Sequence, residues 1–459
     1  MKKIFGLLSV AGCALALSSC GGSGAKANFD IPEEGFNENE QITITFWHTM
    51  GQNIRDVLDE VIVEFNDLYP NVTIDHQQIG GYDDVRDQIL TNMTTGNYPN
   101  MAYCYPDHVA MYNEAQITIS LDNLLADERY GLNGSELKFE GAKEEDFIKA
   151  FFDEGRVFGD ELAYTMPFLK STEALFYNKT FFDEHNLTVP TTWEEMWEVC
   201  AQIKAIDPSS TPLGYDSESN LFITLAETYG YGYTSYQSFD FNNEGMKSLM
   251  KTFKENYDKG YFTTQTLYGA YTNSLLTDLS SPSRAYMCIG STAGAKYQVN
   301  SAGAFETGVT SVPKAANGKA KSISQGPSLV LLKNDNPQTV LATWLFMQYL
   351  ETPTVQARFA LATGYLPVTT PATEVPQYQS FLGMAAGNTA GIAALSTKQA
   401  LAQRDNYFTS ATFVGSSTAR DEVAALIVKI MSDKSNNIDA AIDSYFESAI
   451  QECKYQSGL

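Results

Sequence analysis

The stretch Ile42–Ile79, ITITFWHTMGQNIRDVLDEVIVEFNDLYPNVTIDHQQI, decides the fold class. It opens with alternating β-branched and polar residues, a pattern typical of a half-buried strand. From Ile54 to Leu68, apolar residues then recur at helical spacing, which predicts a helix with one buried face that Pro70 ends. Residues 72–79 form the next predicted strand. The stretch is therefore predicted to be a β-α-β unit.

The same alternation continues toward the C-terminus. Residues 82–96 predict a second helix that stops at Gly96, and residues 101–105 predict a third strand. This order indicates an open α/β sheet, in which ligands bind at the carboxyl ends of the strands. Farther along, the capping-box spacing from Thr191 to Glu194 predicts the start of another helix, and Arg420 is predicted to open a helix near the C-terminus.

Toward the N-terminus, Lys2 and Lys3 precede an apolar run too short to span a bilayer, which is the build of an export signal. The run ends in Leu17-Ser18-Ser19-Cys20, which resembles the lipobox of bacterial lipoproteins. The resemblance implies cleavage before Cys20 and acylation of its thiol, so that lipid chains anchor the protein. A signal peptide that merely contains a cysteine remains the alternative. We expect residues 1–19 to be the signal peptide and 20–40 the lipidated cysteine and a flexible tether.

Composition limits the partners. With 459 residues, 44% of them hydrophobic and 19% charged, the chain can bury a large core and form two or three domains. The formal net charge of −25 excludes a nucleic-acid partner, because a polyanion would be repelled. A small anion stays possible, since a helix N-terminus or one arginine acts locally.

Cysteine and histidine usage argues against metal chemistry. Of the six cysteines, Cys13 and Cys20 lie in the signal region, and the other four stand apart from one another: Cys104, Cys200, Cys288 and Cys453. Buried free thiols are favoured over a disulfide for these four. The four histidines never fall in an H-x-x-x-H arrangement. We therefore expect no metal site and no cofactor.

Six fragments, in order, carry a family resemblance: ITITFWHTMG, PFLKSTEALFYNK, TTWEEM, YMCIGSTAGA, QGPSLVLL and TGYLPVTTPA. The chain resembles the extracellular solute-binding proteins (family 1) of bacterial ABC importers, in the sugar and glycerol-phosphate branch. The resemblance implies an α/β, two-lobed periplasmic-binding-protein-like fold (type II) with hinge strands and an interlobe ligand cleft. The implied crossings fall near 164–169, 284–290 and 322–331. The implied lobes are 41–166 plus 290–324, and 167–289 plus 325–459.

The resemblance also implies a function. A monomeric receptor, held to the extracytoplasmic face of the membrane only by its lipid, would capture a sugar, a glycerol phosphate or a glycerophosphodiester. Hinge closure around this small-molecule solute would then present it to the membrane subunits of an ABC importer.

Candidate ligand contacts follow from similarity to the glycerol-3-phosphate-binding proteins. Carried over position by position, the implied contacts are Tyr82, Ser171, Ser291, Gly326, Tyr365 and Arg420. A phosphate suits a guanidinium, hydroxyl donors and backbone N–H groups, which this set supplies. Other roles stay open beside these: a cap or turn for Ser291 and Gly326, a surface salt bridge for Arg420, and simple stacking in the interlobe cleft for Tyr365, whose motif also occurs in sugar-binding relatives.

The match departs from the family on the headgroup side of the pocket. Pro106 occupies the position of the family's acidic residue, with Asp107 the nearest carboxylate, and of the paired tryptophans only one aromatic, Phe222, remains. A glycerophosphodiester, another polyol phosphate or a neutral oligosaccharide would fit such a change.

An enzyme is the alternative from a different class. A surface glycosidase would need two suitably spaced acids, and 55 acidic residues guarantee some pair without identifying one. The sequence has no G-x-S-x-G, P-loop or G-x-G-x-x-G motif, and its S-x-x-K at Ser311–Lys314 contains Pro313, which disfavours the helix this motif needs. We predict that the chain is not an enzyme, with a surface glycosidase or adhesin as the second hypothesis.

Overall fold

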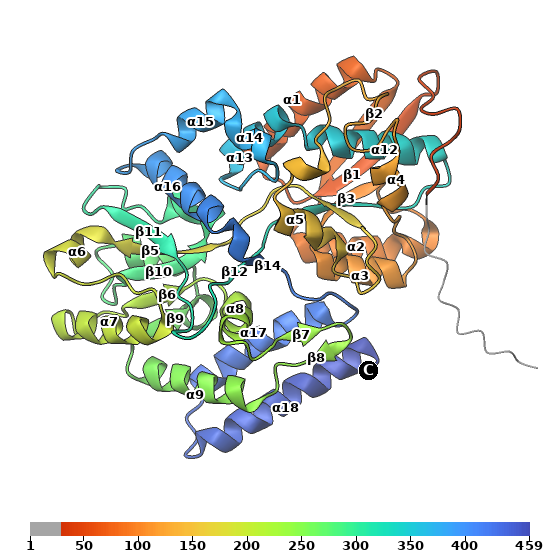
Figure 1. The fold of residues 1–459 in the computed structure, drawn as a ribbon. Coiled ribbons are helices and arrows are strands. Elements are labelled where there is room, and N and C mark those ends of the chain that lie inside the picture. The colour runs from red at the N-terminus through yellow and green to blue at the C-terminus, as the bar shows by residue number, and fades with distance from the viewer. Residues whose placement is uncertain (1–28) are drawn as a thin grey trace, which may run out of the picture.

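The computed structural model describes residues 29–459, so the predictions for the signal peptide and for Cys20 lie outside the described residues. Two five-stranded sheets form the centres of two lobes (Figure 1). In lobe one the strand order is β2 (Val72–Gln78), β1 (Ile42–His48), β3 (Met101–Cys104), β13 (Ser328–Leu331) and β4 (Thr165–Pro167). In lobe two it is β11 (Thr307–Ser311), β5 (Glu173–Asn178), β10 (Met287–Ser291), β6 (Leu213–Tyr215) and β9 (Phe262–Thr264). The predicted two-lobed α/β fold is confirmed.

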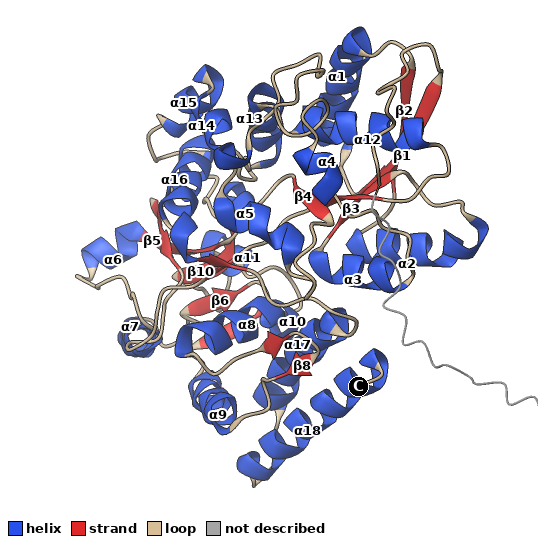
Figure 2. Cartoon of the chain, turned by 45° about the vertical axis from the view of Figure 1, so that its right-hand side comes forward, coloured by secondary structure: helices blue, strands red, loops and turns tan. Residues whose placement is uncertain are grey.

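Lobe one grows from the β-α-β unit that opens the chain. Strands β1 and β2 pair in parallel, and α1 (Gln52–Leu68) connects them over the predicted span. The apolar face of α1 and helix α12 (Pro337–Leu350) cover one face of the sheet. On the other face, α2 (Tyr82–Asn92) and α3 (Pro106–Glu114) pack against β3 and β13. The strands are therefore enclosed by helices on both sides (Figure 2).

Lobe two surrounds its sheet with α7 (Trp193–Ile206), α8 (Glu218–Tyr229), α9 (Glu244–Asp258), α17 (Ser416–Ser432) and α18 (Ile438–Ser457). The predicted capping box of α7 was wrong by one residue. The side chain of Thr192, not Thr191, accepts from the backbone N–H of Glu195 at 3.2 Å. Two adjacent threonines precede two adjacent glutamates, so both pairs have the required spacing. Only the fold, which buries Trp193 as the first helical residue, decides between them.

The predicted lobe boundaries need correction in three places. Strand β11, expected in lobe one, pairs antiparallel with β5 of lobe two. Strand β13, expected in lobe two, pairs with β3 and β4 of lobe one. Residues 284–290, expected to be a crossing, lie largely in β10, which pairs with both β5 and β6 inside lobe two. Short strands of four or five residues carry no sequence signal that says which sheet they join.

The chain passes between the lobes at 168–172, from β4 to β5, and at 324–327, from β12 (Ser322–Ile323) to β13. The two crossings touch each other, since the N–H of Ser171 donates to the carbonyl oxygen of Gln325 at 2.8 Å. A third segment runs beside them, because β12 pairs in parallel with β14 (Tyr407–Phe408). The hinge region therefore consists of three adjacent extended segments.

Residues 29–40 correct the predicted tether. Phe29, Ile31 and Phe36 pack against the core of lobe one, where Phe36 meets Tyr69 edge-on at a centroid distance of 5.6 Å. The N–H of Asn37 also donates to the side-chain oxygen of Gln338 at 2.8 Å. Because these apolar side chains bury surface, the segment is fastened to the lobe instead of extending from it.

Other predictions concern what the chain lacks. Cys104, Cys200, Cys288 and Cys453 are buried free thiols, as predicted. Over residues 29–459, no three His, Cys, Asp or Glu side chains are grouped so that they could hold a metal ion. In the same residues, no helix has both the length and the apolar content needed to cross a membrane.

Candidate functional site

Two cavities lie next to each other between the lobes. The first, here called the acidic cavity, has a volume of about 540 Å³ and is lined from lobe one by Tyr82, Asp83, Tyr105, Asp107 and His108, and from lobe two by Ile223, Tyr233, Arg420 and Asp421. The second, here called the amide cavity, has a volume of about 670 Å³ and is lined by Glu173, Asp216, Asn220, Tyr271, Ser291, Tyr297, Gln298 and Tyr365, among others. Gln325 of the second crossing lines both. The two cavities are therefore neighbouring parts of one interlobe cleft.

The residues that line the acidic cavity from lobe one lie at the N-terminal ends of two helices. Helix α2 begins at Tyr82 after β2, and the Asp84 carboxylate accepts from the N–H of its N-cap residue Gly81 at 2.6 Å. Helix α3 begins at Pro106 after β3, with Asp107 in its first turn. Both helices thus present their first residues at the carboxyl edge of the sheet, where α/β proteins bind ligands.

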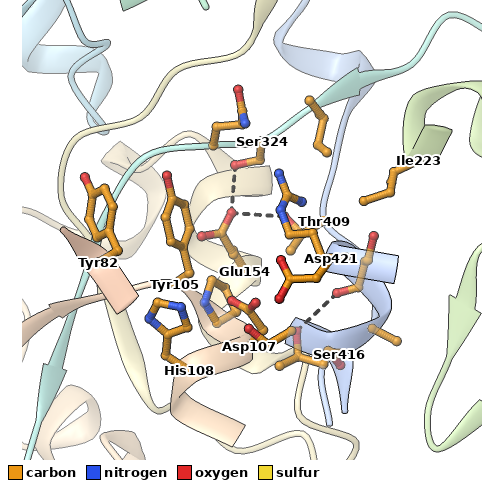
Figure 3. A pocket seen from close by; sticks show the side chains of 18 of the residues that line it. Tyr82, Tyr105, Asp107, His108, Glu154, Ile223, Ser324, Thr409, Ser416 and Asp421 are labelled. Carbon is orange, nitrogen blue, oxygen red and sulfur yellow. Dashed lines mark hydrogen bonds between the residues drawn. The ribbon is translucent and has the colours of Figure 1, made fainter. Parts of the chain in front are cut away.

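The acidic cavity carries more negative than positive charge. Five carboxylates line it, those of Asp83, Asp84, Asp107, Glu154 and Asp421, against the single guanidinium of Arg420 (Figure 3). The hydrogen bond from His108 is the main cause that lowers the pKa of Asp83, with Arg86 adding to it. Burial, and then the nearby Asp83, raise the pKa of Asp421. The cavity is therefore a poor environment for an added negative charge.

Arg420 is held by a relay of polar groups at the junction of the cavities. Its guanidinium donates to the side-chain oxygen of Asn220. The amide nitrogen of Asn220 donates in turn to Glu173 at 2.9 Å, and the Tyr215 hydroxyl donates to the other oxygen of Glu173 at 2.5 Å. Burial raises the pKa of Glu173 to about 7, although both hydrogen bonds oppose the shift. Helix α17 begins at Ser416, so Arg420 lies in its second turn and does not open it as predicted.

The amide cavity offers hydrogen-bond acceptors and exposed aromatic rings. Asp216 accepts from the backbone N–H and the hydroxyl of Thr272 at 2.6 and 2.7 Å, which fixes its carboxylate. Tyr271 and Tyr297 are 63% and 61% exposed, although both line this cavity. Such a mixture of carboxylates, amides and ring faces can bind a polyhydroxylated molecule, whose hydroxyls donate and whose C–H faces stack.

The structure brings five of the predicted contacts into the cleft. Tyr82, Asp107 and Arg420 line the acidic cavity, and Ser291 and Tyr365 line the amide cavity. They come from α2, α3, α17, β10 and the loop after α13 (Pro353–Thr363). Segments more than 300 residues apart in sequence therefore converge on one site.

Three predicted contacts lie elsewhere. Ser171 and Gly326 belong to the two crossings, and neither is among the residues that line the two cavities within the described chain. Gly326 has a φ of +96°, and a Cβ there would come within 2.2 Å of the carbonyl oxygen of Leu169, so the backbone itself requires glycine. Phe222 was a wrong prediction: it lies in the core of lobe two, edge-on to Phe241 at 5.8 Å, while the next residue, Ile223, faces the acidic cavity.

Several cleft residues were missed by the sequence analysis: Tyr105, Glu173, Asp216, Asn220, Tyr233, Gln325 and Asp421. Glu173 carried a usable signal, because it is a lone acid at the start of the apolar run Ala174–Phe176. Asp421 follows the predicted Arg420 directly and could have been included. Asn220 carried no signal, since nothing in a helix sequence shows that one amide faces an arginine 200 residues away.

Fold and cleft together define the class: a two-lobed receptor of the type that closes around small solutes. The model of the bacterial extracellular solute-binding protein family matches residues 60–386, and the chain belongs to this family. Its curated relatives include the sn-glycerol-3-phosphate-binding periplasmic protein UgpB of Salmonella typhimurium, 24% identical over 74% of this chain and 77% of the relative. UgpB of Escherichia coli strain K12 is 22% identical over 75% of this chain and 78% of the relative.

Solved structures show the same fold. UgpB from Mycobacterium tuberculosis in complex with glycerophosphocholine has a TM-score of 0.69 and 17% identity, covering 89% of this chain and 98% of that chain. The cyclic α-maltosyl-1,6-maltose binding protein from Arthrobacter globiformis also has a TM-score of 0.69 and 17% identity, covering 90% and 99%. The fold is therefore the type II periplasmic-binding-protein fold.

Family membership settles the general role. The protein is an extracytoplasmic solute-binding protein of an ABC importer, and it delivers a small solute to that transporter. Proteins of this family are transport receptors, so the prediction that the chain is not an enzyme is confirmed.

Proposed function

We propose that this protein is a lipid-anchored receptor whose cleft captures a hydroxyl-rich, carbohydrate-type solute. We propose further that the cleft binds a sugar more tightly than a simple glycerol phosphate. The observation that carries the proposal is the lining of the cleft. Seven carboxylates line the two cavities, five in the acidic cavity and two, Glu173 and Asp216, in the amide cavity. Asp83 and Glu154 are paired with Arg86 and Lys170, which leaves five carboxylates against Arg420 and Lys296 as cations. Sugar hydroxyls donate to such acceptors, whereas a phosphate dianion is repelled by them.

The exposed tyrosines support a sugar as well. Tyr271 and Tyr297 line the amide cavity and yet present most of their surface to solvent. Aromatic faces left open at the edge of a ligand cleft can stack against the C–H face of a pyranose ring. Closure of the two lobes about the hinge segments would then cover the solute, and its tighter binding to the closed form would report occupancy to the importer.

A glycerol phosphate or glycerophosphodiester is the second candidate, because Arg420, Ser291 and Tyr365 all line the cleft and match the phosphate contacts implied by the resemblance. The relatives named for sn-glycerol 3-phosphate agree with it. Against it stands the bond from Arg420 to Asn220, which already engages part of the guanidinium.

Calorimetric titration of the purified protein with a maltose-type oligosaccharide and with glycerol 3-phosphate tests the proposal. We expect the oligosaccharide to bind and glycerol 3-phosphate to bind more weakly or not at all. Tight binding of glycerol 3-phosphate that Arg420→Ala abolishes would establish the second candidate instead. The matched control is Arg358→Ala, since Arg358 pairs with Glu60 and Glu64 on lobe one and lines neither cavity.

The anchor is tested separately. We propose acylation of Cys20, on the resemblance of Leu17–Cys20 to a lipobox. The variant Cys20→Ser should be released into the medium or stay unprocessed. A cleaved Cys20→Ser protein that still fractionates with the membrane would contradict the anchor without touching the ligand assignment.

A further inference from the structure

We propose that the solute carries a cationic group, a protonated amine or a quaternary ammonium, and that this group is held in the acidic cavity between Asp107 of lobe one and Asp421 of lobe two. This inference rests on the proposed function and narrows the class of solute. The cation could belong to an amino sugar or to the headgroup of a glycerophosphodiester.

The first argument is that three of the five carboxylates in the acidic cavity already have partners in the protein, and two do not. Asp83 forms an ion pair with Arg86 at 2.8 Å and lies 3.4 Å from Nε2 of His108, Asp84 caps α2 through Gly81, and Glu154 pairs with Lys170. In residues 29–459, the carboxylates of Asp107 and Asp421 take part in neither an ion pair nor a hydrogen bond. Two negative charges therefore face the cavity without a partner.

The second argument is where these two charges come from. Asp107 lies on α3 and Asp421 on α17, two helices of opposite lobes that are in contact (Figure 3). Their like charges oppose closure, and Asp83 and Asp107 help to raise the pKa of Asp421, after the larger effect of burial. The nearby guanidinium groups only partly offset this, because Arg86 is bonded to Asp83 and Asp87 and Arg420 to Asn220. A cation between the lobes would turn this repulsion into attraction.

The third argument is independent of charge. Tyr233 and His108 both line the cavity and are each only 3% exposed, yet within the described chain the Tyr233 hydroxyl and the Nδ1 atom of His108 have no hydrogen-bond partner. When His108 carries its proton on Nε2 toward Asp83, Nδ1 presents a lone pair. Buried polar groups in proteins are nearly always satisfied, so these two indicate a bound group that can donate hydrogen bonds, which a protonated amine does and a quaternary ammonium does not.

Aromatic rings complete the site. Tyr82 and Tyr105 line the same cavity with ring centroids 4.7 Å apart at 57° to each other. Cations are attracted to the faces of such rings, and quaternary ammonium groups most visibly so. A bound metal ion is a poorer occupant, since no cluster of three potential ligands exists in residues 29–459.

The test compares matched ligands that differ in the cationic group. One pair is a glucosamine oligosaccharide and its N-acetylated counterpart of equal length, and the other is glycerophosphocholine and glycerophosphoglycerol, two phosphodiesters of equal phosphate charge. Each is titrated calorimetrically into the purified protein after treatment with EDTA. We expect the cationic member of at least one pair to bind about 10-fold or more tightly than its partner, and the pair that responds identifies the source of the cation.

Variants then locate the effect. Asp107→Asn and Asp421→Asn keep the side-chain shape, and each should remove about 10-fold or more of the affinity for the cationic ligand without weakening the binding of the partner that lacks the cation. Asp75→Asn, at an exposed position of β2 that lines neither cavity, is the charge-matched control. Thermal unfolding of each variant verifies that it is folded.

The outcomes separate two failures. Equal affinity for both members of each pair, or an effect of Asp75→Asn as large as that of Asp421→Asn, would overturn the cationic group and leave a carbohydrate receptor standing. If neither these four compounds nor the maltose-type oligosaccharide binds, the proposed function itself is wrong, and the inference falls with it.

Discussion

Two groups of carboxylates lie between the lobes: those at the hinge are buried and paired, whereas Asp107 is half-buried and Asp421 exposed in the acidic cavity. At the hinge, Glu154 and Lys170 are 3% and 0% exposed and form an ion pair. Glu154 also accepts from Ser324 at 2.7 Å and from Thr409 at 3.0 Å (Figure 3). In the adjoining acidic cavity, Asp107 and Asp421 have no such partners within the described residues. This difference indicates that the paired hinge groups stabilise the fold, whereas the unpaired carboxylates of the cavity are available to bind a ligand.

The hinge cluster also joins the segments that must stay together when the lobes move. Lys170 belongs to the first crossing and donates to the carbonyl oxygen of Gly326, in the second crossing, at 3.2 Å. It donates to the Ser328 hydroxyl of β13 at 2.9 Å as well. Because Glu154 reaches Thr409 on the third segment, one ion pair fastens all three. The cluster therefore holds the three hinge segments together, while the acidic cavity beside it can change its shape when the lobes move.

Breaking the hinge pair should have the largest effect. Lys170→Met leaves Glu154 buried without its cation, and we expect the free energy of unfolding to fall by about 3–5 kcal/mol, measured by urea denaturation. The control is Lys149→Met, because the Lys149 side chain is 85% exposed and its pair with Asp153 contributes at most about 1 kcal/mol.

A loss of less than about 1 kcal/mol for Lys170→Met would break the comparison. The hinge carboxylate would then be no more dependent on its partners than the carboxylates of the cavity. Asp421→Asn is the opposite case, since removing an unpartnered charge should leave stability unchanged or raise it slightly.

Glu173 lies between these extremes, because it accepts hydrogen bonds from Tyr215 and Asn220 but, among residues 29–459, has no cation in direct contact. Its pKa is raised from an ordinary value of 4.5 to about 7. The folded state therefore holds this proton more tightly than the unfolded state does. The stability that protonation provides is fully present below about 4.5 and is lost as the pH rises through about 7.

The variant Glu173→Gln removes this titration. We expect the difference in unfolding free energy between variant and parent to shift in favour of the variant as the pH rises from 4.5 to 7, by up to about 1.4 kcal/mol per pH unit. Urea denaturation across this range measures it. A pH-independent difference would mean that Glu173 is ionised throughout and is satisfied like the hinge carboxylate.

Sequence patterns predicted the elements far better than their assembly. The segment Ile42–Ile79 gave its helix and both strands because local periodicity reports burial on one face. The lobe assignment of β11 and β13 failed because pairing with β5 or β3 depends on contacts between distant residues. The packing of residues 29–40 was missed because three separated apolar side chains form no periodic pattern.

The residues of the site also fall into two groups, those that the sequence could predict and those that depend on contacts between distant segments. The resemblance supplied Tyr82, Arg420 and Tyr365, which sit in recognisable motifs. It could not supply the relay from Arg420 through Asn220 to Glu173, whose members are 200 and 47 residues apart. Phe222 was placed one residue from the true cavity position, since one step along a helix turns a side chain by about 100° from cavity to core.

The smallest effect on stability, and the sharpest use of the comparison, is expected for Tyr233. Its hydroxyl lines the acidic cavity without a partner in the described chain, whereas that of Tyr215, equally buried in lobe two, donates to Glu173. Tyr233→Phe should therefore change unfolding free energy by less than about 0.5 kcal/mol, while Tyr215→Phe should cost about 1–3 kcal/mol. For ligand affinity we expect the opposite ranking of the two variants. Tyr233→Phe should lower the affinity by about 2- to 10-fold in calorimetric titration. Equal destabilisation by the two variants would mean that the Tyr233 hydroxyl already stabilises the folded protein without a ligand. The acidic cavity would then not contain polar groups whose partner is the ligand.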